Sequence, residues 1–296
     1  MTNNQSNPAV FRFAPSPNGQ LHLGHAYSAL LNQKMARQAD GKLLLRIEDI
    51  DLARCSTSLE KQMLDDLNWL GFEWDEKPIR QSERLHAYEL ALTALKNAGL
   101  VYPAFMSRGE IKRFVVEKQK QGIQWPYDPD GAPHYPPQDR LLDDKAKAAY
   151  LAEGCPHALR LNMKAALDLI SQPMDWLETG AGWNEENGGV AADPGQWGDI
   201  VLSGKETPAS YHLASVVDDA FSGITHVVRG RDLFWATSVH RLLQQLLGYQ
   251  APKYHHHDLV LDDAGQKLSK SNRDTSLAEL RASGVTPNQI REMIGL

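Results

Sequence analysis

The amino-terminal part of the chain has the pattern of a strand, a turn, a helix and a second strand. Val10 to Ala14 predicts a short strand, and Pro15 to Gly19 is dense in turn formers. A helix with one buried face is expected from Gly24 up to Asp40-Gly41. Leu43 to Ile47 is almost entirely apolar, as expected of a parallel strand covered on both faces. Such a unit opens a nucleotide-binding α/β fold, in which ligands bind beyond the carboxyl ends of the strands.

The helical pattern continues after this unit and then gives way to an irregular stretch. Ser58 to Gly71 and Glu83 to Gly99 predict two further helices that end at a glycine. Two later stretches, Gly122 to Gln138 and Gly180 to Gly198, are rich in residues that favour turns and loops. We therefore expect residues 101–200 to form an inserted, irregular segment.

Regular structure is expected again from residue 199 onward. Asp199 to Leu202, a turn at Ser203-Gly204-Lys205 and Ser210 to Val217 together predict a hairpin. The remaining expected elements are a buried strand at Thr225 to Val228, a helix at Thr237 to Leu247 and a last short strand at Leu259 to Leu261. The chain of 296 residues is long enough for two domains, or for one domain with a large insertion.

The composition limits which partners the protein can bind and in which cellular compartment we expect it. The chain carries 31 Lys and Arg against 37 Asp and Glu, a net charge of −6, so a nucleic acid would have to meet a local basic patch. Cys55 and Cys155 form no zinc-finger motif and fit a reducing compartment. Met1 to Val10 lacks the pattern of a signal peptide, and no apolar run approaches the ~20 residues of a membrane span. We expect a cytoplasmic protein with no membrane partner.

Two histidines mark the junction of the first turn and the first helix. In His22-Leu23-Gly24-His25 the imidazoles are three residues apart, on one face of the first helical turn, and Gly24 lets a nucleotide approach the backbone. A helix N-terminus favours phosphate because of its unpaired N–H groups and partial positive charge. Taken alone, the motif is explained equally well if His22 and His25 are ordinary helix-capping residues.

A second motif, near the other end of the chain, favours the nucleotide hypothesis. Lys267-Leu268-Ser269-Lys270-Ser271 combines flexible point charges with hydroxyl donors, which suits a triphosphate whose charge shifts during a reaction. Taken alone, this stretch is more often a solvated surface loop. An H-x-G-H near the N-terminus and a K-x-S-K-S far along the chain are much more specific together than either is alone.

With these motifs the sequence resembles the class I aminoacyl-tRNA synthetases of the glutamyl and glutaminyl branch. The resemblance implies an α/β fold with a Rossmann-like catalytic domain of about residues 1–100 and 201–275, an inserted acceptor-binding-type subdomain at 101–200 and a short helical C-terminal segment at 276–296. It is carried, in family order, by Phe11-Arg12-Phe13-Ala14-Pro15-Ser16-Pro17 with Gly19, His22 to His25, Arg46-Ile47-Glu48-Asp49-Ile50-Asp51, Tyr211-His212-Leu213-Ala214 with Val216-Val217-Asp218-Asp219, Thr225 to Leu233, and Lys267 to Ser271.

The resemblance also implies a reaction. Glutamate attacks the α-phosphate of ATP to give glutamyl adenylate and pyrophosphate, and a hydroxyl group on RNA then takes the glutamyl group. Catalysis is mainly positioning and charge stabilisation, with Mg²⁺ expected on the triphosphate. The implied catalytic residues are His22, His25 and Lys270, of which Lys270 neutralises pyrophosphate. The implied ATP-binding set is completed by Gly24, Lys267 and Ser269.

Glutamate has two carboxylates and an ammonium, so its site needs a fixed cation, hydrogen-bond donors and a carboxylate. Arg12 at the end of the first strand and Ser16 in the turn suit a carboxylate, and Glu48 at the end of the second strand suits the ammonium. By resemblance, Tyr211 and Arg229 match the family's remaining glutamate contacts. Taken singly, an arginine or glutamate at a strand end is as often a partner in a structural ion pair.

The chain departs from the family at a zinc site. Many relatives carry cysteines in the insertion, whereas this chain has Ala104, Met106 and Asp139 at the apparent equivalents, so we predict no zinc and no other protein-held metal. The run His255 to His257 could suggest a metal cluster, but neighbouring side chains of an extended chain alternate sides. We interpret it as a polar approach to the last strand, and Cys155 as a buried or incidental thiol.

Two features of the insertion offer contacts to RNA. Arg108 to Lys120 holds five basic and two acidic residues, so it is either an RNA-facing helix or a solvated face. Trp176, Trp183 and Trp197 either stack on bases or, more often in such segments, pack a loop-rich region.

Chain length favours one branch of the family. Only 25 residues follow Ser271, and we expect these to be too few for the anticodon-reading domains of an enzyme that charges tRNA(Glu). The branch without those domains activates L-glutamate with ATP in the absence of tRNA and attaches it to the queuosine base in the anticodon of tRNA(Asp). We expect that function, and a monomer. The alternatives are a small-molecule nucleotidyltransferase and a catalytically idle paralogue that acts as an RNA-binding regulator.

Overall fold

The main sheet of the molecule is parallel over most of its width. The computed structural model describes residues 8–261 and 275–296, and its main sheet has the strand order β3-β2-β1-β9-β10-β6-β7. All neighbouring strands in it are parallel except the last pair, β6 and β7. In chain order the strands are β1 (Val10–Phe13), β2 (Lys42–Ile47), β3 (Ile79–Arg80), β6 (Asp175–Glu178), β7 (Gly188–Ala191), β9 (His226–Gly230) and β10 (Lys253–His257).

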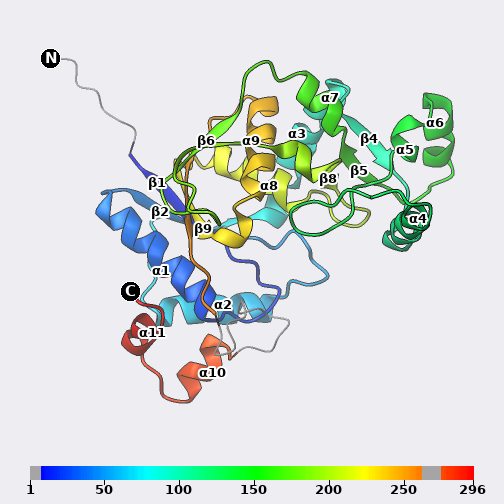
Figure 1. Cartoon of the computed structure of the whole chain (residues 1–296). Coiled ribbons are helices and arrows are strands. Elements are labelled where there is room, and N and C mark those ends of the chain that lie inside the picture. The colour runs from blue at the N-terminus through cyan, green and yellow to red at the C-terminus, as the bar shows by residue number, and fades with distance from the viewer. Residues whose placement is uncertain (1–7, 262–274) are drawn as a thin grey trace.

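Helices pack against both faces of this sheet (Figure 1). Phe11 and Phe13 of β1 point to one face, where they join the core formed with α1 (Leu23–Gln38), α2 (Thr57–Trp69), α10 (Leu277–Ala282) and α11 (Pro287–Met293). Arg12 alternates with them and meets Asp219 of α8 (Tyr211–Phe221) on the other face. The core on that side is built with α3 (Leu85–Asn97) and α9 (Ala236–Leu247). The expected strand–helix–strand unit is therefore present, and the α/β fold class is confirmed.

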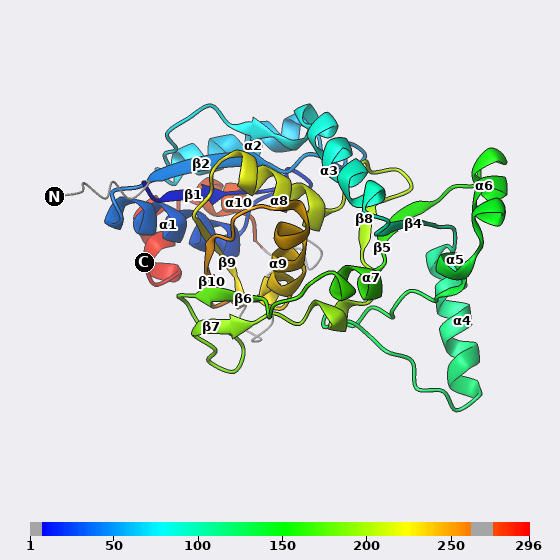
Figure 2. The same cartoon turned by 90° about the horizontal axis from the view of Figure 1, so that it is seen from above.

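A smaller antiparallel sheet lies beside the main one. Its order is β4-β5-β8, from β4 (Val101–Ala104), β5 (Ala158–Leu161) and β8 (Val201–Ser203). In Figure 2 this sheet lies between the main body and a projecting part that carries α4 (Arg108–Lys120), α5 (Gln138–Leu141) and α6 (Asp144–Ala152). The helix α7 (Met163–Asp168) and the 3-10 helices η1 (Gln81–Glu83), η2 (Pro194–Trp197) and η3 (Arg231–Leu233) complete the elements.

The domain boundaries expected from the sequence stay a prediction. The sheet topology shows, however, that part of the expected insertion belongs to the main sheet. β6 and β7 fall within residues 101–200, yet β6 pairs with β10 and so belongs to the main sheet. Part of the expected insertion therefore returns to the body of the molecule and lies next to its last strand. No helix within residues 8–261 and 275–296 is long and apolar enough to cross a membrane.

Two elements expected from the sequence are wrong. The second arm of the expected hairpin, Ser210 to Val217, is helical: Ser210 caps α8 by accepting a hydrogen bond from the Leu213 N–H at 3.4 Å. Seven consecutive residues of this helix, 213–219, are buried, so its apolar residues lack the one-sided spacing that marks a surface helix. Among the described residues the last strand is β10 at Lys253–His257, which pairs in parallel with β9 along its whole length. Leu259 and Val260 lie in no strand, and Leu261 is in a single β-bridge.

Candidate active site

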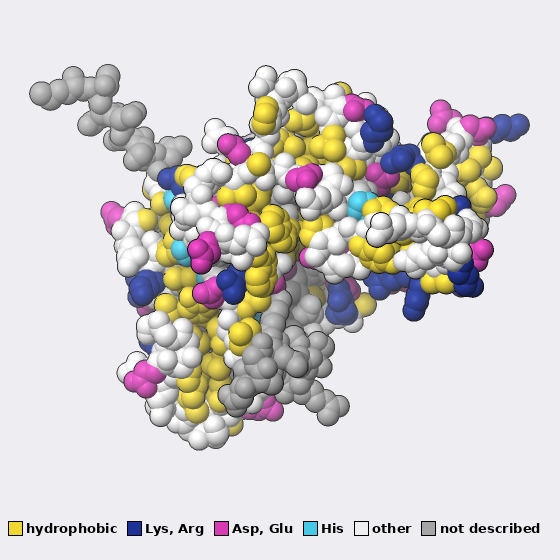
Figure 3. All heavy atoms as spheres, in the orientation of Figure 1, with side chains coloured by type: hydrophobic (Ala, Val, Ile, Leu, Met, Phe, Trp, Pro, Cys, Tyr) yellow, Lys and Arg dark blue, Asp and Glu magenta, His cyan; other side chains and the backbone are white. Residues whose placement is uncertain are grey.

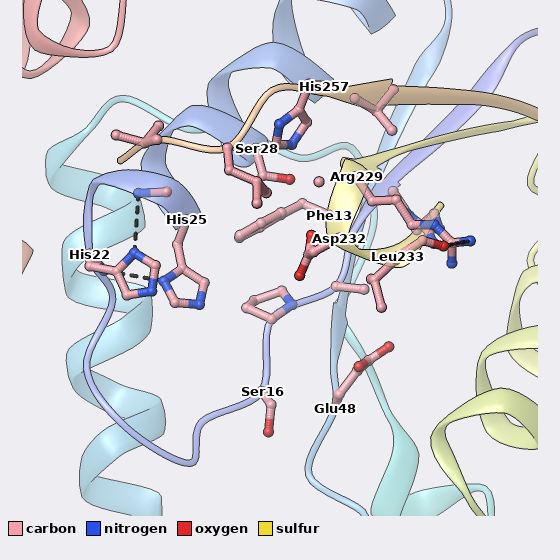
Figure 4. A pocket seen from close by; sticks show the side chains of 18 of the residues that line it. Phe13, Ser16, His22, His25, Ser28, Glu48, Arg229, Asp232, Leu233 and His257 are labelled. Carbon is pink, nitrogen blue, oxygen red and sulfur yellow. Dashed lines mark hydrogen bonds between the residues drawn. The ribbon is translucent and has the colours of Figure 1, made fainter. Parts of the chain in front are cut away.

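A pocket of about 460 Å³ opens where β1, β9 and β10 end, beside the N-terminus of α1. This is the edge at which parallel α/β sheets bind ligands. Figure 4 shows its lining with His22 and His25 on one side, Arg229 on the other, and Ser16 and Glu48 toward one end. The pocket brings together all the predicted site residues that the structure describes: Arg12, Ser16, His22, Gly24, His25, Glu48, Tyr211 and Arg229. The predicted Lys267, Ser269 and Lys270 lie outside the described residues.

The two histidines of the H-x-G-H motif are held by the start of α1. His22 is the N-cap: its Nδ1 accepts from the Gly24 N–H at 3.1 Å, while the His22 N–H donates to Nδ1 of His25 at 3.2 Å. Their ring centroids are 3.9 Å apart. The helix-capping explanation is therefore correct for the backbone, but both rings also line the pocket. A Cβ on Gly24 would lie 3.0 Å from Cε1 of His22, so glycine here keeps the ring in place.

A buried cluster of ions forms the floor between β1, β2 and α8. Asp219 accepts from Nε of Arg12 at 3.1 Å and from Nη1 of Arg46 at 2.5 Å, and Arg46 also donates to Glu48 at 2.9 Å. Burial works to raise the pKa of Asp219, but the two guanidinium groups lower it below its usual range. Burial raises the pKa of Glu48 in spite of Arg46, so a bound cation would stabilise its charged form. Arg46 and Asp219 occur in the motifs that carry the family resemblance, but the sequence predicts neither of them as a site residue.

Arg229 differs from these ions, because its hydrogen-bond partners among residues 8–261 and 275–296 are all uncharged. Its side chain donates to ring nitrogens of His256 (3.1 Å) and His240 (3.3 Å), to the hydroxyls of Thr237 (2.7 Å) and Tyr211 (3.4 Å) and to the carbonyl of Leu233 (3.1 Å). Burial lowers the pKa of His256 to about 4 and that of His240 well below its usual value, so both rings are neutral near pH 7. In the described part of the chain Arg229 makes no ion pair. A buried cation of this kind attracts an anionic ligand.

The histidine run therefore has a different place from the one expected. His255 to His257 are themselves the end of β10 rather than an approach to a later strand. Their side chains alternate: His256 points to buried Glu178 and Arg229, whereas His257 lines the pocket beside Tyr27, with ring centroids 4.8 Å apart. Period-two alternation in a buried strand could have indicated that one of these histidines faces a polar core.

The position of the family's zinc site holds a different set of contacts. Asp139 Oδ2 accepts from the backbone N–H groups of Phe105 (2.6 Å) and Met106 (3.3 Å) and from the hydroxyl of Tyr135. Among the described residues, no three side chains of His, Cys, Asp or Glu lie close enough together to hold a metal ion. The absence of zinc stays a prediction, and the observed contacts are those of a carboxylate that ties the start of α4 to α5. Cys155 is free and partly exposed rather than buried.

The candidate RNA contacts separate into exposed and buried groups. α4 buries only Val115, and Arg108, Lys112, Arg113 and Lys120 are exposed. Figure 3 shows Lys and Arg side chains gathered along the lower edge of the part that carries α4. Of the three tryptophans, Trp176 and Trp197 are buried in packing contacts with Phe234 and His212, and Trp183 is 45% exposed. The packing explanation therefore holds for two of them.

Comparisons with known proteins agree with one another. The catalytic-domain family of class I tRNA synthetases for E and Q matches residues 9–296. The glutamyl-Q tRNA(Asp) synthetase of Rhodobacter capsulatus is 46% identical over 97% of this chain and 100% of its own length. The glutamate–tRNA ligase of Synechococcus sp. (strain JA-3-3Ab) is 35% identical over 96% of this chain, which spans 56% of the ligase. The solved structure of the glutamate-tRNA synthetase from Elizabethkingia anophelis matches this chain with a TM-score of 0.73 and 28% sequence identity. The match covers 90% of this chain and 53% of the Elizabethkingia chain.

Proposed function

The chain belongs to the class I tRNA synthetases of the glutamate and glutamine group, and we propose that it activates L-glutamate with ATP without tRNA and then transfers the glutamate to the queuosine base in the anticodon of tRNA(Asp). The observation that carries the proposal is the single pocket in which the helix N-terminus with its two histidines faces Arg229, a buried cation hydrogen-bonded to uncharged groups. A nucleotide at one end and an anionic amino acid at the other fit this arrangement.

At the nucleotide end we assign ATP to the N-terminus of α1. The α1 helix offers backbone N–H groups and a partial positive charge, and the His22 and His25 rings line the same end of the pocket. Because Gly24 carries no side chain, the phosphates can approach the backbone. Mg²⁺ would enter with ATP as part of the substrate, held mainly by phosphates and water. We keep Lys267, Ser269 and Lys270 as proposed contacts of the leaving pyrophosphate, with Lys270 as the main charge.

At the amino-acid end we assign glutamate to the residues around the ion cluster. The side-chain carboxylate would pair with Arg229 and the hydroxyl of Tyr211, and the ammonium with Glu48. Ser16 lies in the turn next to Glu48 and can donate to the α-carboxylate. Because Arg12 is already paired with Asp219, its role would be to fix that carboxylate and to add positive potential rather than to bind glutamate alone.

In this pose the reaction needs no covalent enzyme intermediate. An oxygen of the α-carboxylate attacks the α-phosphorus of ATP, the bond to the β-phosphate oxygen breaks, and pyrophosphate leaves. In the second step a hydroxyl of the modified base attacks the carbonyl carbon, the bond from that carbon to the phosphate oxygen breaks, AMP leaves, and the hydroxyl proton passes to water. The protein contributes position and positive charge for the phosphate transition state.

Exchange of radioactive pyrophosphate into ATP tests the first step. We expect exchange that depends on L-glutamate and does not require RNA. Exchange that responds to another acid, such as pantoate, or to a phosphosugar would favour a small-molecule nucleotidyltransferase, and no exchange with any of them would favour an idle paralogue. The same preparation, examined by light scattering, tests the expected monomer.

A further inference from the structure

Glu178 and His256 form a fully buried pair behind Arg229, on the side away from the pocket. Both side chains have no exposed surface, and Oε2 of Glu178 lies 2.6 Å from Nδ1 of His256. Glu178 ends β6, His256 lies in β10 and Arg229 in β9, so the three residues cross adjacent strands of the main sheet. None of the roles assigned above to substrate contacts uses Glu178 or His256.

Each oxygen of Glu178 has defined donors. Oε1 accepts from two backbone N–H groups, those of His256 and Gly180, both at 2.9 Å. Oε2 accepts from Nε1 of Trp176 at 3.2 Å and faces Nδ1 of His256. Burial works to raise the pKa of Glu178, but the hydrogen bonds from His256 and from the Gly180 N–H lower it below its usual range, so the group is a carboxylate.

These contacts determine which nitrogen of His256 carries the proton. Nε of Arg229 is always a donor, and it points to Nε2 of His256 at 3.1 Å, so Nε2 has to be the unprotonated acceptor. The proton of the neutral ring is then on Nδ1, where it donates to Glu178. Thr237 completes a closed ring of contacts, because its hydroxyl accepts from Nη2 of Arg229 at 2.7 Å and lies 3.3 Å from Nε2 of His256.

We propose that Glu178, acting through His256, is a positioning residue for Arg229: it fixes the Nδ1–H tautomer of His256 and thereby the orientation in which Arg229 receives the carboxylate of the amino acid. The proposal rests on the proposed function for the identity of that carboxylate as the glutamate side chain. The pair is not a substrate contact.

An imidazole between the carboxylate and the guanidinium has a physical advantage. A carboxylate in direct contact with Arg229 would neutralise it and compete with the substrate, as Asp219 does for Arg12. The neutral ring holds the guanidinium by a hydrogen bond and leaves its charge for the ligand. Gly180 makes this geometry possible, because a Cβ there would lie 2.3 Å from the carbonyl oxygen of His256.

The variant Glu178→Gln separates this role from simple packing. The two backbone donors keep the amide oxygen on the Oε1 side, so the amide NH₂ faces Nδ1 of His256 and donates to it. The ring proton then moves to Nε2, and two donors oppose each other at Arg229. We expect the KM for glutamate to rise about tenfold, the size of effect seen when a metal-binding histidine loses its outer hydrogen-bond partner. The KM for ATP and kcat should stay within about twofold of wild type.

Tyr102→Phe is the matched control. Tyr102 lies on β4 and does not line the pocket, is 5% exposed, and in this variant loses one buried hydrogen bond, from its hydroxyl to Asp199 at 2.8 Å. It should lower the melting temperature as much as Glu178→Gln does and leave the KM for glutamate unchanged. Equal KM values for glutamate in the two variants would overturn the positioning role, whereas absence of glutamate-dependent exchange in the wild type would overturn the proposed function instead.

A spectroscopic measurement on the wild-type protein decides the tautomer without any assay. Nitrogen-15 NMR of histidine-labelled protein, assigned through His256→Gln, should show Nδ1 of His256 protonated and Nε2 unprotonated near pH 7. A protonated Nε2 in the wild type would overturn the proposal even if Glu178→Gln fails to fold.

Discussion

Arg229 is the buried cation of the proposed glutamate site, and its hydrogen-bond partners in the described part of the chain are all uncharged. Arg12 and Arg46 are equally buried, but each is paired with Asp219, and Arg46 also with Glu48. The five partners of Arg229 in the described part of the chain are neutral. The positive charge of Arg229 is therefore not offset by these partners and is available to a carboxylate ligand. Discrimination between glutamate and glutamine should therefore depend on this guanidinium more than on any other side chain described here.

The substitution Arg229→Gln tests this preference. A charged hydrogen bond contributes about 1.5 to 3 kcal/mol, so the KM for glutamate should rise about 10- to 100-fold, with the KM for ATP unchanged. The selectivity for glutamate over glutamine should fall by a similar factor in pyrophosphate exchange. Arg241→Gln is the control, since Arg241 on α9 donates to the Asp175 carbonyl away from the pocket. Unchanged selectivity in Arg229→Gln would contradict the assignment.

Gly24 makes a separate prediction for the nucleotide end. In Gly24→Ala the new methyl group meets Cε1 of His22 at 3.0 Å and Nδ1 at 3.1 Å, so the ring must shift and its capping hydrogen bond weakens. We expect the KM for ATP to rise several-fold, on the order of the ~1 kcal/mol of a lost helix cap, while the KM for glutamate stays the same. Gly109→Ala on α4, where the nearest atom is 3.6 Å away, should change neither value.

At the scale of elements, α8 joins the two sides of the active-site floor. Asp219 of this helix binds arginines from β1 and β2. The preceding residue, Asp218, binds Arg84 (2.6 Å) and Tyr88 (2.8 Å) at the start of α3 and Gln81 (3.1 Å) of η1. Two adjacent buried carboxylates therefore hold α8 against strands on one side and a helix on the other. The position of Tyr211, at the start of α8, depends on these contacts.

Loss of one of these carboxylates should be costly. In Asp218→Asn a buried charge that faces Arg84 is removed, and breaking such a pair destabilises a protein by about 3–5 kcal/mol. We expect urea denaturation to show a loss of that size. The control Asp168→Asn breaks an exposed pair with Lys164 and should change the free energy of unfolding by less than about 1 kcal/mol. Equal effects of the two substitutions would refute a structural role for the α8 carboxylates.

The predictions from the sequence agree best with the structure where a site residue is placed by residues that are its neighbours in the chain. The helix start at His22 and the strand ends at Arg12 and Glu48 could be predicted because the turn residues and apolar runs around them lie next to them in the chain. Contacts between distant residues could not: Glu178 and His256 are 78 residues apart, and Arg12 and Asp219 are 207 residues apart. A single sequence shows which residue types are present but does not show which of them pair across a sheet.

At the scale of the whole molecule, buried neutral histidines make stability depend on pH. Burial lowers the pKa of His212 and of His256 from 6.5 to about 4. The unfolded chain thus binds more protons than the folded one between about pH 6.5 and 4, and the free energy of unfolding must fall as the pH falls through this range. Each histidine can contribute up to about 3 kcal/mol of this loss.

Urea denaturation at pH 7.5, 6 and 5 measures this dependence. The free energy of unfolding should fall steadily below about pH 6.5, and His212→Gln should reduce the slope. His86→Gln is the control, because the side chain of His86 is 82% exposed, and this variant should leave the slope unchanged. A stability that is constant from pH 7.5 to 5 would contradict neutral burial of these rings.

The final acceptor of the glutamyl group distinguishes the proposed function from the charging of tRNA(Glu), and one transfer assay identifies it. Radioactive L-glutamate and ATP are supplied with tRNA(Asp) that contains queuosine, with tRNA(Asp) that lacks it, and with tRNA(Glu). We predict label on queuosine-containing tRNA(Asp) alone. Label on tRNA(Glu), with none on queuosine-containing tRNA(Asp), would contradict the proposed function.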